Sequence, residues 1–431
     1  MIDTFNPMNF DITKNLHGHV RVETRDRWTG RIVDSQEKEN LVTNAIQRAI
    51  QSTQFTANAE AYMSAAWTPL CDKALGGVFL FDGTLTESAS NIDFPPSAKL
   101  VAYAGQSADS SNTRGGSYNE AESVFTSNGF TTVWDFLTSQ ANGTISSLAR
   151  TSHFFLTRPA YPNWSGMSLT AGANTSLTMT SNFNWLGYDE TNHYLYLAPS
   201  SVQTINGVAY APTNIYRIKY DISVLSLLNC IPPASHMTLI KTLTSSDGTT
   251  SAINYAYDKF NNNFVYINGT TIHKLAMDGT HTTSTATGTS GDGFAITENY
   301  YWRSTGSVVY RIQKTNTANI ETYTVDYCDR LRPAGESGDV VFCSTLRNQN
   351  WSILYPDGST IPWAGFDTGA GQYAWMQNFR KLGFYYSAGN YATGSFITPS
   401  SHYLGTIANL DSPVTKTSSQ TMKITYTLTE A

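Results

Sequence analysis

"YDKFNNNFVYI" (residues 257–267) is the stretch that decides the fold, because an earlier stretch, "YDETNHYLYL" (residues 188–197), has the same order of residue types. Each contains Tyr-Asp, then a short polar loop, then alternating aromatic and aliphatic residues. Alternation over a few residues predicts a β-strand, and the polar loop predicts a turn. We therefore interpret the two stretches as copies of one strand-turn-strand unit.

A second strand type recurs downstream of these units. Its copies are "NIYRIKYD" from residue 214, "TIHKLAMDG" from residue 271, "VVYRIQKT" from residue 308 and a more divergent "WSILYPDG" from residue 351. Their irregular spacing overlaps the roughly 40–50 residues of a β-propeller blade. The repeat predicts a β-propeller-like domain over residues 156–375 with about five blades. An irregular β-sandwich whose strands share only composition is the alternative.

The composition points to an all-β protein. Charged residues make up 14 % of the 431 residues and aromatic residues 13 %, whereas charged residues are about 25 % of an ordinary soluble protein. Exposed helix faces are usually rich in charge, so this balance favours sheets with Ser, Thr, Asn and Tyr on their surfaces. The net charge of −6 gives no electrostatic reason to expect nucleic acid or an anionic membrane as a partner. No stretch approaches the roughly 20 apolar residues of a membrane helix, and no signal peptide is visible.

Both ends of the chain carry clear strand signals. In "TMKITYTLTEA" (residues 421–431) apolar residues alternate with Lys and Thr, which predicts a strand with one buried face. Near the start, "HVRVETRDRWTGRIVDS" (residues 19–35) predicts a hairpin that turns near Trp28-Thr29-Gly30. "NLVTNAIQRAIQS" (residues 40–52) then predicts one short helix, capped by Asn40 or Thr43. Further on, Asn142-Gly143 predicts a two-residue hairpin turn.

These signals predict a split architecture. Residues 1–155 form an N-terminal β docking module with the short helix, and residues 376–431 supply strands that complete it. The module is expected to be β-sandwich-like, with the propeller-like region inserted between its two parts.

No motif for catalysis is present, so we expect no catalytic residue, no cofactor and no enzyme. Aspartates could act in pairs on a glycosidic bond, but the repeated Tyr-Asp favours a structural role in holding turns. The aspartates considered are Asp189, Asp258, Asp339 and Asp367. His17 and His19 could share one side of a strand and form a metal site, with an N-terminal loop that carries two solvated histidines as the alternative.

Four tryptophans are candidates for stacking on a sugar ring, with packing between blades as the alternative for each. They are Trp302, Trp351, Trp363 and Trp375. The four cysteines are far apart and form no zinc pattern, so we expect small core residues, with a single Cys328–Cys343 bridge as the alternative. The other two are Cys71 and Cys230.

Three segments together resemble bacteriophage tail proteins of the tail-fibre, baseplate or receptor-binding type. They are "VRVETRDRWTGRIVDSQEKENLVTNAI" (residues 20–46), "VWDFLTSQANGTISSLARTS" (residues 133–152) and "LGTIANLDSPVTKTSSQTMKITYTLTEA" (residues 404–431). The propeller-like region carries none of this resemblance.

The resemblance implies a virion structural protein of the tail, assembled in the host cytoplasm and extracellular in the free particle. Its expected partners are other virion tail proteins, further copies of itself and a host cell-surface glycan read by the propeller. A purely architectural collar, rim or head-decoration protein is the alternative, and a tail-associated glycan depolymerase is the second alternative.

Overall fold

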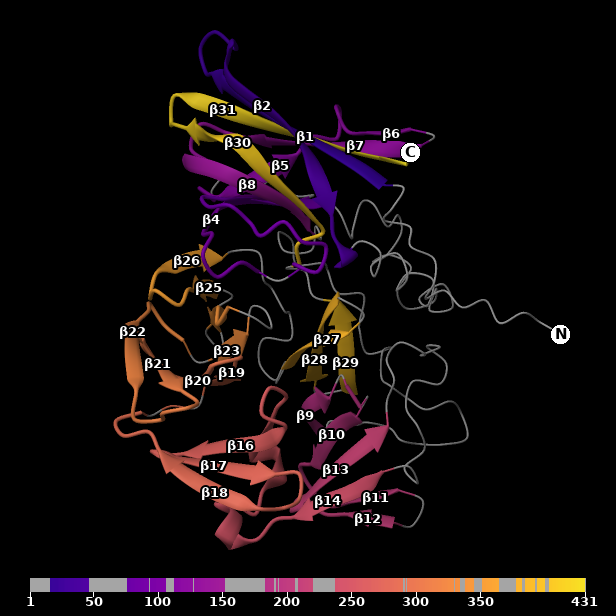
Figure 1. Ribbon diagram of the computed structural model, residues 1–431, viewed down its shortest axis with the longest axis vertical. Helices are drawn as coiled ribbons and strands as arrows, with labels where there is room; N and C mark the ends of the chain where they lie inside the picture. The colour runs from indigo at the N-terminus through magenta and orange to yellow at the C-terminus, as the bar shows by residue number, and fades with distance from the viewer. Residues whose placement is uncertain are drawn as a thin grey trace, which may run out of the picture. The chain divides into compact units, whose positions relative to one another are not determined.

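The structure is a computed structural model, and nine stretches of the chain are described below. They are residues 16–45, 76–105, 112–151, 183–219, 237–333, 338–344, 351–363, 377–399 and 403–430, without 93, 127, 190, 193, 206–207, 290, 292, 329, 382–383 and 392–393. Within them the protein is nearly all β (Figure 1).

The chain divides into two compact units. Unit 1 comprises Met1–Ala160, Ala364–Asp367 and Ser401–Ala431, and unit 2 comprises Tyr161–Trp363 and Thr368–Ser400. The sequence placed residues 376–400 with the terminal strands, but the strands described there belong to unit 2. That part of the expected boundary is wrong, because these strands form a sheet of their own and pair with none of unit 1.

Unit 1 is built around one ten-stranded sheet, in the order β31-β1-β2-β30-β8-β3-β4-β5-β7-β6. Its strands are β1 (Leu16–Asp26), β2 (Ile32–Val42), β3 (Gly77–Phe81), β4 (Leu100–Gly105), β5 (Gly115–Tyr118), β6 (Val124–Thr126), β7 (Gly129–Phe136), β8 (Gly143–Thr151), β30 (Thr406–Lys416) and β31 (Gln420–Glu430). A further pairing of β31 with β7 closes the sheet on itself. The expected β-sandwich-like form is therefore replaced by one closed sheet.

The two ends of the chain pair along their full strands. In the antiparallel register of β1 and β31, Leu16 lies opposite Glu430 and Asp26 lies opposite Gln420. Met422, Ile424, Tyr426 and Leu428 are buried and the odd-numbered residues 421–429 are partly exposed, as the alternation of residues 421–431 predicted. Val22 and Ile424, which face each other in this register, both lie in the apolar core of unit 1.

Two local predictions in unit 1 need correction. The strands on either side of Asn142-Gly143 do not pair with each other: β8 pairs with β3 and β30, while β7 pairs with β31, β5 and β6. The dipeptide is thus a turn between distant positions in the sheet. The helix also begins later than predicted, since Asn40 still belongs to β2 and the first helical residue is Asn44. Thr43 is the cap, because its hydroxyl accepts the Ala45 N–H at 3.2 Å; the rest of the predicted helix lies outside the described residues.

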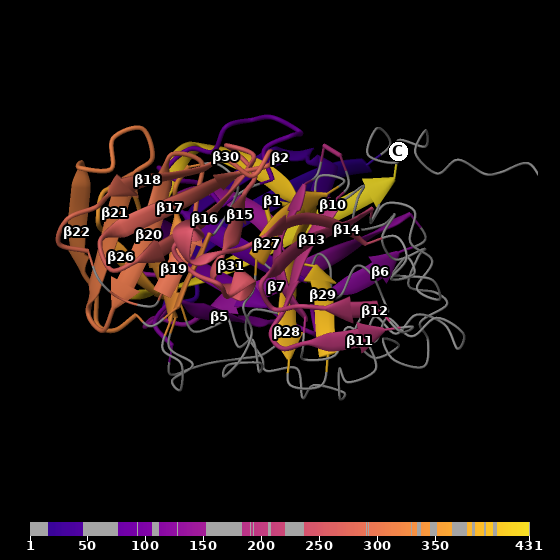
Figure 2. The same cartoon turned by 90° about the horizontal axis from the view of Figure 1, so that it is seen from below.

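Unit 2 is a succession of antiparallel sheets (Figures 1 and 2). The first contains β9 (Phe183–Asp189), β10 (Tyr194–Pro199), β13 (Asn214–Lys219) and β14 (Thr238–Thr242), and the second contains β15 (Ala256–Asp258), β16 (Asn263–Asn268), β17 (Thr271–Ala276) and β18 (His281–Thr285). The third contains β19 (Gly293–Ile296), β20 (Tyr300–Thr305), β21 (Val308–Gln313) and β22 (Ile320–Thr324), and the fourth contains β23 (Arg330–Pro333), β24 (Val341–Ser344), β25 (Trp351–Leu354) and β26 (Thr360–Trp363). The fifth has three strands, β27 (Gln377–Lys381), β28 (Phe384–Tyr391) and β29 (Gly394–Pro399).

A sixth, two-stranded sheet of β11 (Gln203–Ile205) and β12 (Val208–Tyr210) lies between β10 and β13 in the chain. The five larger sheets follow one another as propeller blades do. The four repeated stretches found in the sequence form β13, β17, β21 and β25, which are the third strands of four successive sheets. The first strands touch their neighbours: β9 contacts β15 and β27, and β23 contacts β19 and β27. The fifth sheet therefore adjoins the first, and the interpretation as a β-propeller-like repeat is preferred over the sandwich.

Candidate interaction surface

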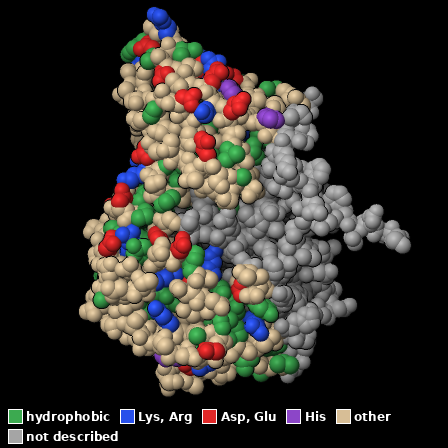
Figure 3. Space-filling view, in the orientation of Figure 1, with side chains coloured by type: hydrophobic (Ala, Val, Ile, Leu, Met, Phe, Trp, Pro, Cys, Tyr) green, Lys and Arg blue, Asp and Glu red, His purple; other side chains and the backbone are tan. Residues whose placement is uncertain are grey.

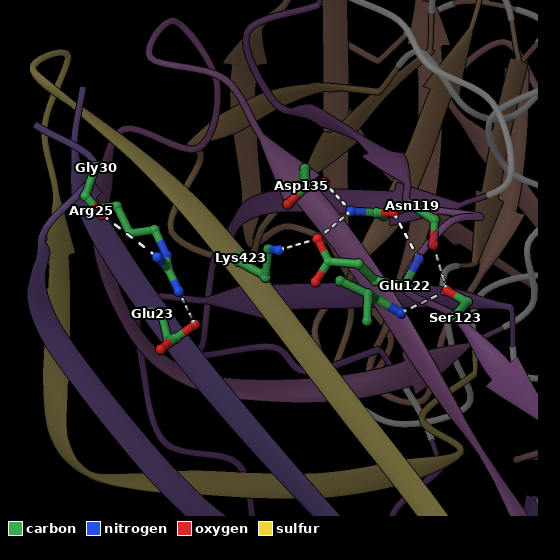
Figure 4. Close-up of polar contacts among 9 residues, drawn as sticks. Glu23, Arg25, Gly30, Asn119, Glu122, Ser123, Asp135 and Lys423 are labelled. Atoms are coloured by element: carbon green, nitrogen blue, oxygen red, sulfur yellow. Dashed lines mark hydrogen bonds and ion pairs between the residues drawn. The ribbon is translucent and has the colours of Figure 1, made fainter. Parts of the chain in front are cut away.

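One face of the closed sheet of unit 1 is polar. We call it the outer face and define it as the outward side chains of β2, β1, β31 and β7. At its centre, Glu23 Oε1 lies 2.6 Å from Arg21 Nη2, and Glu23 Oε2 lies 3.1 Å from Arg25 Nη2. Only 7 % of the Glu23 side chain is exposed, because the two arginines cover it. The carboxylate thus neutralises part of the charge of both guanidinium groups; Figure 4 shows its contact with Arg25.

A second polar network lies beside it. Lys423 stands opposite both Glu23 and Asp135 in the strand register, and it forms an ion pair with Glu122 (Figure 4). Asn119 Nδ2 donates to Glu122 Oε1 at 3.1 Å and to Asp135 Oδ2 at 2.7 Å. The hydrogen bond from Lys423 holds the pKa of the Glu122 carboxyl below its usual value.

These contacts leave the outer face with paired charges. Basic, acidic and histidine side chains are interspersed on the described surface of unit 1 (Figure 3). Such a face can form hydrogen bonds with a protein partner, but it offers no strong field of one sign.

His17 and His19 lie on this face, where both side chains are exposed, as expected for alternate residues of one strand. The Nε2 atom of His19 lies 3.7 Å from Glu37 Oε2. Among the described residues, however, no group of three or more His, Cys, Asp or Glu is placed to hold a metal ion. Both histidines lie on strand β1, as the metal candidate required, and not in the N-terminal loop of the alternative.

The tryptophan candidates have different outcomes. Trp302 is fully buried, donates from Nε1 to Thr297 Oγ1 at 2.9 Å and stacks on Tyr323, so its indole presents no face to a sugar. That candidate is a packing residue between the third and fourth sheets. Trp351 and Trp363 are paired backbone positions of β25 and β26, and Trp375 lies outside the described residues.

The repeated aspartates hold turns. Asp189 Oδ1 accepts the backbone N–H groups of Thr191 and Asn192, each at 3.0 Å. Asp258 Oδ1 accepts the N–H of Phe260 at 3.1 Å in the equivalent turn of the second sheet. The structural role predicted for the Tyr-Asp repeat is confirmed at both positions.

Asp258 and Asp339 also link neighbouring sheets, which the sequence did not reveal. Lys314, directly after β21 of the third sheet, places Nζ 2.8 Å from Asp258 Oδ2 in the second sheet. Asp339, before β24, accepts the Thr297 hydroxyl at 2.5 Å. Local periodicity carries no information on such partners, because 56 residues separate Asp258 from Lys314. Asp367 lies outside the described residues.

Cys328 and Cys343 are buried thiols that are not joined in a disulfide. They lie together in the apolar core between the third and fourth sheets. For Cys328 and Cys343, the prediction of small core residues is confirmed and the alternative of a bridge between them is wrong. Cys71 and Cys230 lie outside the described residues.

Comparison with known proteins does not assign this chain to a family. No family model matches the chain, and no curated protein matches its sequence. A streptogramin B lyase structure is 9 % identical and aligns over 82 % of this chain and 94 % of its own, with a TM-score of 0.28. Virginiamycin B lyase from Staphylococcus aureus is 10 % identical and aligns over 70 % of this chain and 100 % of its own, with a TM-score of 0.29. Hsv2 from Kluyvelomyces marxianus is 7 % identical over 50 % of this chain and 63 % of its own, with a TM-score of 0.28.

These likenesses are too distant to support an argument about activity. The propeller-like arrangement rests on the strand pairings of this chain itself. No helix among the described residues is long and apolar enough to cross a membrane.

Proposed function

We propose that this chain is a structural component of a bacteriophage tail, attached through unit 1 and carrying the propeller of unit 2 for recognition of the host surface. The observation that supports the attachment is where the three tail-like segments lie. Residues 20–46 hold the greater part of β1 and all of β2, residues 133–152 hold β8 and the second half of β7, and residues 404–431 hold β30 and β31.

These segments are far apart in the sequence but adjacent in the sheet. Their strands form the unbroken order β7-β31-β1-β2-β30-β8. The three tail-like segments, although far apart in the sequence, thus form one continuous part of the sheet. This is expected if that part of the sheet has the same role in many tail proteins. Unit 2 carries no such resemblance, which fits a part that varies with the host.

The proposal does not include catalysis. Asp189 and Asp258 are engaged in turns, and Trp302 is buried, so the described residues give no support to the depolymerase alternative. We propose further that several copies assemble, because repeated copies raise the avidity for weakly bound glycans.

The test uses particles of the phage that encodes this chain. Antibody fragments raised against the purified chain should decorate the tail in electron micrographs, and the purified chain added in excess should slow adsorption of the phage to its host. Absence of the chain from purified particles would overturn the proposal. Decoration without any effect on adsorption would favour the architectural alternative.

A further inference from the structure

The turn of the β1–β2 hairpin carries an exposed apolar group. We call residues 26–33 the hairpin tip. Trp28 is 79 % exposed, which makes it the most exposed large apolar side chain of the described residues. Ile32 and Val33 in the same tip are 47 % and 56 % exposed. Three large apolar side chains are thus in water within six consecutive positions, and nothing in the described parts of the chain covers them.

The backbone of the hairpin tip is fixed by local hydrogen bonds. Asp26 Oδ1 accepts the N–H of Trp28 at 3.1 Å, and the N–H and hydroxyl of Thr29 at 2.8 Å each. Gly30 follows with a φ of 69°, which a glycine adopts without strain. The hydrogen bonds from Thr29 hold the pKa of Asp26 below its usual value, because they favour the ionised carboxylate. A side chain presented on a locked turn loses little conformational entropy when it binds.

The hairpin tip also differs from the outer face in its charge. The Arg27 guanidinium lies 4.1 Å from the centre of the Trp28 ring system. Neither Arg27 nor Arg31 forms an ion pair with any described residue, whereas Arg21 and Arg25 are paired with Glu23. The space-filling view shows basic side chains at this tip (Figure 3). Tryptophan and arginine are among the residue types that dominate the binding energy of protein interfaces. The hairpin tip exposes one tryptophan with an arginine on either side of it in the sequence.

We infer that the hairpin tip inserts Trp28 into an apolar pocket rimmed by carboxylates on a neighbouring protein of the particle. This inference rests on the proposed function and names the chemistry of the attachment. The apolar pocket would cover Trp28, Ile32 and Val33, and the carboxylates would pair with Arg27 and Arg31. An anionic lipid surface fits less well, because the net charge of the chain is −6 and the charges of the adjoining outer face are paired.

The experiment measures incorporation of the full chain into particles. A phage lacking the gene is complemented with wild-type chain, with Trp28→Ala, with Trp28→Phe, or with Arg27→Gln and Arg31→Gln together. Leu239→Ala serves as the control, because Leu239 is a half-exposed apolar residue of β14 in unit 2. Thermal melting of each purified variant verifies that it folds.

Trp28→Ala is expected to reduce incorporation by roughly tenfold or more, and Trp28→Phe by less. The double arginine variant should also incorporate less than wild type, and this deficit should shrink as salt is raised, because salt screens the ion pairs that only wild type can form. Leu239→Ala should match wild type. Folded Trp28→Ala that incorporates like wild type would overturn the inference and leave the proposed function intact. Wild-type chain missing from particles would instead reject the proposed function. Sedimentation of the chain with phosphatidylglycerol vesicles, lost in Trp28→Ala, would also overturn the inference.

Discussion

Lys314 and Asp258 form a buried ion pair between the second and third sheets of unit 2. Their side chains are 6 % and 0 % exposed, and Lys314 Nζ lies 2.8 Å from Asp258 Oδ2. Burial lowers the pKa of Lys314, and the negative charge of Asp258 opposes that effect. Tyr301 completes the group, since its hydroxyl donates to Asp258 Oδ2 at 3.4 Å. Because neither charged side chain is hydrated, each relies on the opposite charge of the other for stabilisation.

Removing one partner of this pair should destabilise unit 2. Lys314→Met leaves a buried carboxylate without its cation, so its free energy of unfolding should fall by about 3–5 kcal/mol. Asp258→Asn keeps an oxygen for the turn and should cost a similar amount. The double variant should lose less than the sum of the two. Urea unfolding followed by tryptophan fluorescence measures all three, and strict additivity would show that the charges do not interact.

Adjacent residues of β31 should differ sharply in their effect on stability. Ile424 is fully buried in the core of unit 1, so Ile424→Ala should cost about 2–5 kcal/mol of its free energy of unfolding. Thr425 lies on the outer face, and Thr425→Ala should change it by no more than about 0.5 kcal/mol. Denaturant titrations provide the comparison. Equal effects would mean that β31 does not have one buried face.

Lys416 should make unit 1 more stable as the pH rises from 8. It is 1 % exposed, and burial lowers its pKa from 10.5 to about 8. Between those values the unfolded chain binds more protons than the folded one, so the free energy of unfolding rises with pH. Between pH 7.5 and 9.5, wild type should gain about 1–2 kcal/mol relative to Lys416→Met. Parallel curves for the two proteins over this range would contradict the pKa shift.

Cys343 should resist alkylation in the folded chain. Its hydrogen bond with Cys328 and its complete burial raise the pKa of the thiol well above its usual value, so it stays protonated at neutral pH. Iodoacetamide should modify it slowly in native protein and rapidly in urea, which peptide mass spectrometry can follow. Rapid labelling of native protein, or a Cys328–Cys343 disulfide under non-reducing conditions, would contradict this expectation.

Local features were predictable from sequence where one short segment holds the whole signal. The alternation of residues 421–431, the hairpin turn at Trp28 and the turns held by Asp189 and Asp258 depend only on neighbouring residues. The repeat located the third strands of four sheets because each copy carries its own pattern.

Features that depend on distant partners could not be predicted in this way. The neighbours of β8 are β3 and β30, so the turn chemistry of Asn142-Gly143 gave no guide to its pairing. Trp302 was a candidate for stacking on a sugar because the sequence does not show whether its side chain is exposed. Its burial results from packing against the next sheet, which local sequence does not reveal. The exposure of Trp28 was also missed, although an aromatic residue between two arginines in a predicted turn was a usable signal.

The pairing of β1 with β31 has a consequence for synthesis. His17 and Thr429 face each other in this register although they are 412 positions apart. A ribosome adding about 5–20 residues per second needs roughly 20–80 s to cover that distance. The five blade-like sheets of unit 2 all emerge during this interval, so unit 2 can complete its fold on the ribosome first. During this time β31 has not been synthesised, so the edges of β1 and β7 that pair with it remain without hydrogen-bond partners. A chaperone that shields nascent strands would act at that stage.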